Sequence, residues 1–222
     1  MSKTIAMIPA RMGSQRLKKK NLCELEGVPL ITRAIRKCKE ANCFDEIWVN
    51  SENVEFKAIA EQEGVNFHKR PEALGDNNAT SEQFVAEFLQ SHECDYLLQV
   101  HSIAPLLSTS EVESFTKEFV ASEADVFLSC IEDQIEVSYQ NVPVNFTFNE
   151  KTNSQDLKPL QRITWSITGW KRETYLQAIA DGKCATYTGN VMFFAVDPIS
   201  GHVIKTQQDL DIAEALLKVL KK

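Results

Sequence analysis

The sequence predicts an α/β protein of three layers, in which a mostly parallel sheet carries helices on both faces. Strand-like and helix-like segments alternate through about the first 130 residues, and such alternation favours right-handed crossovers between parallel strands. Two of the expected helices open on residues that can cap them, Thr80 and Ser108. The 222 residues suit a single domain over 1–222.

Short apolar runs predict the strands, and helical spacing of apolar residues predicts the helices. The expected strands lie at 4–9, 46–51, 65–70, 95–101, 124–132, 164–170 and 190–196. The expected helices lie at 29–42, 54–64, 80–91, 108–122, 171–182 and 207–222. Residues 133–163 differ, because they are polar, contain Pro143 and Pro159 and alternate like a strand only in part. They predict a small β-rich hairpin insertion within the domain, which serves as a flap or as a dimerisation arm.

Composition argues against several kinds of partner. A formal net charge of −7 argues against general binding of nucleic acid or of a membrane surface. No apolar run approaches the length that spans a bilayer, and the N-terminal run is too short for a signal peptide. We therefore expect a cytoplasmic protein whose six cysteines are reduced thiols, without a zinc site.

The densest positive charge stands in one loop, "IPARMGSQRLKKKN" at 8–21, directly after the first expected strand. Its cations are Arg11, Arg16, Lys18, Lys19 and Lys20. Ligands of such sheets bind beyond the carboxyl ends of the strands, where cations and backbone N–H groups suit phosphates. The loop predicts a polyphosphate site, in which Gly13 allows close approach of the backbone and Ser14 adds a hydroxyl. A solvated basic turn is the alternative.

The loop and the segments after it resemble the acylneuraminate cytidylyltransferases, or CMP-sialic acid synthetases, to which the CMP-Kdo synthetases are more distantly related. The family opens with a strand followed by A-R-x-G-S-x-x-x-x-x-K-N. The matching residues here are Ala10, Arg11, Gly13, Ser14, Lys20 and Asn21. The resemblance continues in order through "EGVPLITRAI", "EIWVNSEN", "RPEALGDNNATSE", "QDLKP" and "TQQDLDIAEALL". It spans nearly the whole chain and implies the nucleotide-diphospho-sugar transferase-like fold.

This resemblance implies an enzyme that transfers CMP from CTP to a sialic-type or related 2-keto sugar acid and releases pyrophosphate, for the synthesis of lipopolysaccharide or another surface glycan. It implies that Arg11 and Lys20 neutralise the triphosphate. The further residues that it implies for nucleotide binding are Ala10, Gly13, Ser14, Asn21 and Arg70. Gln99 matches a family residue near the sugar, and a strand-end amide satisfied by the backbone is the alternative. The resemblance also implies a homodimer whose arm at 133–163 shares the site between chains.

Two departures from the family pattern bear on the chemistry, and the first lies in "QVHSIAPLLS". His101 stands where the Kdo relatives have a metal-binding Asp, and Leu107 stands where the family has Arg. A neutral imidazole at His101 hydrogen-bonds a sugar hydroxyl or acts as a weak base, and a histidine satisfied by a carbonyl is the alternative. Arg162 is a further candidate for the sugar acid, as are Lys158 and Tyr175.

The second departure concerns Mg²⁺, the cofactor that the resemblance implies. The family has D-x-D-T before its last helix, whereas "HVIKT" here places Val203 and Lys205 at the positions of the acids. Mg²⁺ prefers oxygen ligands, so Asp209 and Asp211 are the remaining candidates. Acids at a helix start are more often partners of the helix dipole, and we favour that interpretation. Lys205 is expected to supply positive charge in place of the metal and to act in catalysis.

Two other functions stay open from the sequence. A catalytically impaired homologue would bind nucleotide without efficient transfer, and the missing acid pair favours it. A nucleotidyltransferase for another sugar or another base is the second alternative. The sugar acid itself is not readable, because the least similar region, 133–190, contains the expected sugar pocket.

Overall fold

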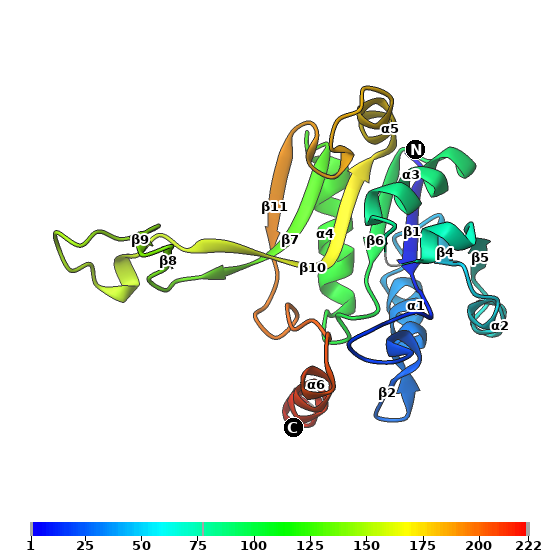
Figure 1. Ribbon diagram of the computed structural model, residues 1–222, viewed down its shortest axis with the longest axis horizontal. Helices are drawn as coiled ribbons and strands as arrows, with labels where there is room; N and C mark the ends of the chain where they lie inside the picture. The colour runs from blue at the N-terminus through cyan, green and yellow to red at the C-terminus, as the bar shows by residue number, and fades with distance from the viewer. Residues whose placement is uncertain (1, 77, 221–222) are drawn as a thin grey trace.

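The structure is a computed structural model that describes residues 2–76 and 78–220 (Figure 1). Its main strands are β1 (Thr4–Pro9), β4 (Glu46–Ser51), β5 (Asn66–Lys69), β6 (Tyr96–Val100), β7 (Val126–Asp133), β10 (Leu160–Lys171) and β11 (Val191–Ala195). Its α-helices are α1 (Leu30–Ala41), α2 (Glu55–Gln62), α3 (Ser81–Ser91), α4 (Thr109–Ala121), α5 (Arg172–Ala180) and α6 (Gln207–Leu220). Short hairpins pair β2 (Glu24–Leu25) with β3 (Val28–Pro29) and β8 (Ser138–Tyr139) with β9 (Val142–Pro143). Single 3₁₀ turns form at η1 (Lys20–Leu22), η2 (Glu72–Gly75), η3 (Ser154–Asp156) and η4 (Ala185–Tyr187).

The seven main strands form one sheet in the order β11-β7-β10-β6-β1-β4-β5. β1 pairs in parallel with both β4 and β6, as do β4 with β5 and β7 with β11. The exception is β10, which lies antiparallel between β6 and β7. The predicted three-layer α/β fold with a mostly parallel sheet is confirmed, and the carboxyl ends of β1, β4 and β6 meet at one edge.

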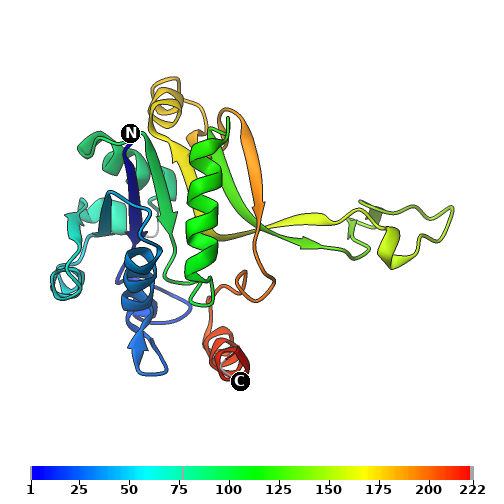
Figure 2. The same ribbon diagram turned by 180° about the vertical axis from the view of Figure 1, so that it is seen from behind.

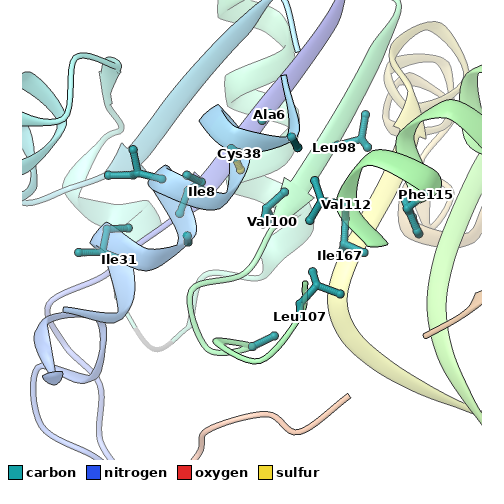
Figure 3. Close-up of a cluster of buried hydrophobic side chains, with 14 of the residues drawn as sticks. Ala6, Ile8, Ile31, Cys38, Leu98, Val100, Leu107, Val112, Phe115 and Ile167 are labelled. Atoms are coloured by element: carbon teal, nitrogen blue, oxygen red, sulfur yellow. The ribbon is translucent and has the colours of Figure 1, made fainter. Parts of the chain in front are cut away.

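Apolar side chains that alternate along β1 pack against helices on opposite faces of the sheet. Ala6 and Ile8 belong to a cluster with α1, α2 and α4 (Figure 3), and Figure 2 shows α4 in front of this face. Ile5 and Met7 belong to the cluster with α3 and α5. Because each fully buried Ile, Leu or Phe stabilises the fold by about 1.5–3 kcal/mol, these two clusters fix the sheet as the rigid frame of the molecule.

Helix ends follow the expected chemistry. Thr80 and Gln83 form a capping box at the start of α3, and Ser108 and Glu111 form another at the start of α4. Gly64 follows α2 with φ +69°, the left-handed conformation that suits glycine. Among residues 2–76 and 78–220, no helix is both long enough and apolar enough to cross a membrane.

Residues 133–163, here called the arm, project from the body of the molecule (Figures 1 and 2). The arm leaves at the end of β7 and returns as the start of β10, with the β8–β9 hairpin between them. Five large apolar side chains of the arm are exposed: Ile135, Tyr139, Val142, Val144 and Phe148. The expected strand at 164–170 is longer in the structure. It begins at Leu160 as β10, because the first residues of β10 pair with β7 at the base of the arm.

Candidate active site

A cavity of about 360 Å³, here called the first cavity, opens at the carboxyl end of β1. Its walls come from the loop after β1, from the loop after β6 and from the residues that precede α6. Eight of the predicted site residues line it: Ala10, Arg11, Ser14, Lys20, Asn21, Arg70, His101 and Lys205. Segments far apart in the sequence are thus brought to one edge of the sheet.

Positive charge dominates the wall of the first cavity. Its described lining includes no carboxylate and five cationic residues: Arg11, Arg16, Lys20, Arg70 and Lys205. Burial, with the nearby charges of Arg16 and Arg11, lowers the pKa of Lys20. Arg70 is paired with Glu52, and cations that gather on one wall repel one another and attract a polyanion. Lys18 and Lys19 belong to the same loop but are exposed and lie outside the lining.

Asn21 fastens the cationic loop to the loop after β6. Its side chain is 5 % exposed, its Nδ2 donates to the carbonyl of Arg11 at 3.0 Å, and its Oδ1 accepts from the hydroxyl of Ser102 at 2.7 Å. Both polar atoms of the amide therefore contact protein. Asn21 lines the cavity, and its observed contacts hold the shape of the wall.

Arg70 is buried at the end of β5 and is 2 % exposed. Its Nη2 donates to the carbonyl of Ala10 at 3.0 Å and to Glu52 Oε2 at 2.8 Å, and its guanidinium lies 4.8 Å from the centre of the Phe84 ring. Burial lowers the pKa of Arg70 and the contact with Glu52 opposes that shift. The Arg70 guanidinium thus links the end of β5 to the end of β1 at the cavity.

Glu52 is a supporting residue that the sequence analysis missed. Besides binding Arg70, its Oε1 accepts from the backbone N–H of Met12 at 2.9 Å and so holds the cationic loop. Gly75 packs directly against it, since a Cβ at Gly75 would lie 2.5 Å from Glu52 Cδ. A signal existed in the sequence, because Glu52 directly follows β4 and must lie at the same edge as the loop after β1.

His101 directly follows β6, and its half-buried imidazole is neutral near pH 7. Its backbone N–H donates to Ser166 at 3.1 Å, and its Nε2 is buried without a hydrogen-bond partner among the described residues. Burial, and then the charge of Lys20, lowers the pKa of His101 to about 4. A buried ring nitrogen without a protein partner on a cavity wall can hydrogen-bond a ligand.

Lys37 is a second supporting residue that the sequence analysis missed. It lies on α1, is 8 % exposed, and donates from Nζ to the carbonyls of Ala104 at 3.2 Å and Pro105 at 3.4 Å. These carbonyls belong to the loop that also carries His101 and Ile103. Burial lowers the pKa of Lys37 to about 8. Lysine is rarely buried unless its ammonium has such partners. The sequence signal for Lys37 was therefore its position near the apolar face of α1.

A larger cavity of about 540 Å³, here called the second cavity, adjoins the first and shares Ile103 and Lys205 with it. Residues of β10, of the segment before α6 and of the first turn of α6 supply its other walls: Arg162, Ile163, Thr164, Trp165, Pro198, Gly201, His202, Val203 and Asp209. The structure therefore places Arg162 in the second cavity, where its Nε donates to Asp133 at 2.7 Å.

Four other candidates lie outside both linings, and one of them, Lys158, is exposed on the arm. Gln99 on β6 is 1 % exposed, and its Nε2 has no partner within the described chain. Gly13 is exposed, with no heavy atom within 4 Å of the place where a Cβ would stand. Tyr175 is 1 % exposed in the apolar cluster of α5, and its hydroxyl donates to the carbonyl of Glu82 at 3.3 Å. The structure thus gives Tyr175 a packing role.

The two acids considered for Mg²⁺ are engaged in helix α6. Asp209 Oδ2 accepts from the backbone N–H groups of Lys205 at 2.9 Å and Thr206 at 2.8 Å, and Asp211 Oδ1 accepts from Gln207 at 2.8 Å. Within residues 2–76 and 78–220, no three His, Cys, Asp or Glu side chains are grouped to hold a metal ion. Because Mg²⁺ requires oxygen ligands, this donor set does not fit a resident ion.

Comparison with known proteins agrees with this geometry. A family model described as cytidylyltransferase matches residues 5–178. The chain belongs to the cytidylyltransferase family. Pseudaminic acid cytidylyltransferase from Campylobacter jejuni subsp. jejuni serotype O:23/36 (strain 81-176) is 29% identical and is covered over 97% of its length by 98% of this chain.

Longer members of the family are matched only in part. N-acylneuraminate cytidylyltransferase from Escherichia coli O18:K1:H7 (strain RS218 / NMEC) is 32% identical over 64% of this chain and 33% of its own length. N-acylneuraminate cytidylyltransferase A from Danio rerio is 33% identical over 51% of this chain and 27% of its own length. The chain thus spans about a third or less of these two curated relatives.

Solved structures share the fold at low sequence identity. CMP:2-keto-3-deoxy-manno-octonic acid synthetase complexed with CTP has a TM-score of 0.73 at 17% identity, covering 98% of this chain and 99% of that one. The 4-diphosphocytidyl-2C-methyl-D-erythritol synthase of Anaerococcus prevotii DSM 20548 has a TM-score of 0.71 at 14% identity over the same shares. The cytidylyltransferase family and its nucleotide-diphospho-sugar transferase-like fold are therefore established for this chain.

Proposed function

We propose that this protein transfers CMP from CTP to a nonulosonic, sialic-type or related 2-keto sugar acid. The observation that carries the proposal is the pair of adjoining cavities that share Ile103 and Lys205. The first has cations and no described carboxylate on its wall, which suits a triphosphate, and the second gives room for an acidic acceptor. The family and the activities for which its relatives are named support the same reaction.

In the proposed reaction, the anomeric hydroxyl oxygen of the sugar acid attacks the α-phosphorus of CTP. A new P–O bond forms, the bond from the α-phosphorus to the bridging oxygen breaks, the hydroxyl loses its proton to solvent, and pyrophosphate leaves. Such transfer depends on positioning and on charge neutralisation. Arg11 and Lys20 hold the triphosphate, and the neutral His101 accepts a hydrogen bond from the attacking hydroxyl.

In this proposal, Lys205 lies where the two substrates meet. Its side chain lines both cavities, so its ammonium stabilises the charge that develops on the α-phosphate. The misfit of Asp209 and Asp211 to Mg²⁺ supports this assignment, and no step is assigned to a metal. Lys205→Gln should lower kcat while Lys205→Arg restores part of it, whereas Lys218→Gln on the exposed side of α6 is the control. Equal kcat values for Lys205→Gln and wild type would remove the assignment.

The proposed function is tested by pyrophosphate release from each of the four nucleoside triphosphates, with a panel of 2-keto sugar acids. CTP-dependent release with one sugar acid is the expected result. Release with another triphosphate would overturn the choice of nucleotide. Calorimetric binding of CTP without release would support the impaired homologue instead, a function favoured by Val203 and Lys205 at the positions where the family has acids.

We also propose that the arm joins two copies of this chain in a cytoplasmic homodimer, with no nucleic acid or membrane as partner. The exposed apolar side chains of the arm support association, because apolar side chains gathered on one exposed segment are typical of an interaction surface. Light scattering behind size exclusion should give a mass near twice 25.1 kDa. A monomer at about micromolar concentration would contradict the dimer, since stable dimers persist there.

A further inference from the structure

Trp165 has an unusual backbone conformation, with φ +58°. The other described non-glycine residues with positive φ lie in turns or beside helix ends: Lys19, Glu26, Asn42, Gln140 and Asn141. Trp165 lies instead inside β10. A bulky residue in the left-handed region is a conformational outlier that persists only where its surroundings enforce it, and such residues gather at functional sites.

A bulge in β10 imposes this conformation. Ile163 pairs with Cys130 and Thr168 pairs with Leu128, so five steps along β10 stand against two along β7. The bulged segment therefore contains three more residues than the strand opposite. Bulges change the direction in which side chains point and are common beside active sites.

Buried hydroxyl groups hold the bulge in place. Ser129 Oγ accepts from the backbone N–H groups of Ser166 and Ile167, each at 3.2 Å, and lies 2.9 Å from Thr164 Oγ1. Ser129 and Ser166 are both 0 % exposed. Two N–H groups that the bulge removes from regular pairing thus bind one side chain of β7. These hydrogen bonds stabilise the bulge, because they give its buried polar groups partners.

The bulge places Trp165 on the wall of the second cavity. Its ring centre lies 6.2 Å from that of the exposed Tyr187, at an interplanar angle of 61°. The same wall carries the cations Lys205 and Arg162, whose Nε donates to Asp133, and one acid, Asp209, whose carboxylate accepts backbone N–H groups at the start of α6. An aromatic surface beside cations is complementary to a ligand that has both an apolar face and an anionic group.

We propose that Trp165 determines which acceptor the second cavity takes, an inference that rests on the proposed function. The indole stacks on the apolar C–H face of a ring-closed sugar acid, and Arg162 and Lys205 bind its carboxylate. An open-chain keto acid has the carboxylate but no such face, so it gains nothing from the indole. Trp165 therefore selects cyclic sugar acids over short or open-chain keto acids.

The test compares Trp165→Ala and Trp165→Phe with the wild-type protein, using the sugar acid that the panel identifies. Trp165→Ala should raise the KM for the sugar acid about tenfold and leave the KM for CTP within about twofold, whereas Trp165→Phe keeps most of the affinity because a ring remains. Trp165→Gly accompanies them, since glycine adopts φ +58° without strain and guards against misfolding. Trp48→Phe, on β4 and outside both linings, is the control.

Calorimetry of the sugar acid in the presence of CMP measures the same contact without catalysis. Loss of sugar-acid affinity in Trp165→Ala and Trp165→Gly, with CMP affinity retained, supports the inference. Unchanged affinity for the sugar acid, or an equal loss for an open-chain keto acid that binds, overturns it. If the wild type binds a sugar acid but releases no pyrophosphate, only the proposed transfer fails. If it binds no sugar acid of the panel, both proposals fail.

Discussion

The first and second cavities are built by two parts of one sheet that differ in construction. The first lies where parallel strands end together, and buried polar contacts such as Asn21–Ser102 and Arg70–Glu52 fix its loops. The second lies beside the antiparallel β10, where a bulge and the base of the arm form the wall. The parallel part provides cations on a rigid frame, and the antiparallel part determines the shape of the second cavity. Substitutions in the two parts should therefore have different consequences.

The largest expected effect is on the stability of the parallel part. Arg70→Met leaves Glu52, whose side chain is 14% exposed, without its partner. Breaking a buried pair in this way should lower the free energy of unfolding by about 3–5 kcal/mol. Urea denaturation measures the change. Arg36→Met removes a partner from Glu63 at a site where Arg36 is 51% exposed, and should cost about 0–1 kcal/mol. Equal losses for the two variants would contradict the rigid polar frame.

Lys37 provides a pH-dependent test of the same frame. Burial lowers its pKa from 10.5 to about 8 in the folded state, and the groups that also act on it are Cys38, Glu111, Arg33 and Glu40. Between pH 8 and 10.5 the unfolded chain binds more protons at this position, so stability rises with pH. The wild type should gain about 3 kcal/mol relative to Lys37→Met across that window.

Denaturation midpoints of both proteins at several pH values measure this difference. The comparison between proteins matters because the pKa of Cys38 is raised to about 12 by burial and acts in the opposite direction with pH. Because Lys37 and Cys38 act on each other's pKa, both proteins are compared in a Cys38→Ala background, where the thiol contribution is absent. Lys57→Met, at an exposed position on α2, should show no such trend. If the stability difference between the wild type and Lys37→Met does not change with pH, the pKa of Lys37 is not lowered in the folded protein.

A smaller effect is expected on ligand affinity alone. Lys20→Met removes one cation from the first cavity and should weaken CTP binding about 10- to 100-fold, the value of one charge-assisted hydrogen bond. Lys18→Met is the matched control, because Lys18 lies in the same loop outside the lining. It should change the affinity less than about twofold, since exposed charges are screened. Calorimetry with CTP gives both values, and equal losses would point to a diffuse field in place of a defined site.

The smallest effect on stability is expected in the arm. Phe148 is 74% exposed, so Phe148→Ser should change the free energy of unfolding by no more than about 0.5 kcal/mol. The same variant should weaken dimerisation, measured by light scattering against protein concentration. Val54→Ser, at a site 58% exposed outside the arm, should leave the dimer intact. Dimers of equal strength in the two variants would remove the arm from the interface.

The same contrast explains what could be predicted from the sequence. Strand and helix bounds in the first half agree closely with the expected ones, because strand and helix patterns alternate strictly there and capping boxes mark the starts of α3 and α4. The cation-lined cavity followed from one loop and the rule that ligands bind beyond strand ends. Arg11, Lys20 and Arg70 accordingly line it together.

The antiparallel part was less predictable, for physical reasons. "TWSITGW" reads as an ordinary strand, and only pairing with β7 reveals that Trp165 lies in a bulge. The direction of β10 depends on the path of the arm, which local propensity does not encode. Supporting contacts between distant segments, such as Lys37 with the carbonyl of Ala104, also require the fold to be known.

The close packing of Gly75 against Glu52 sets a limit on sequence variation far from any ligand. A methyl group there would push the carboxylate away from both Arg70 and Met12. A random mutagenesis library sorted for retention of nucleotide binding should therefore keep glycine at this codon, alongside the codons of the cations themselves.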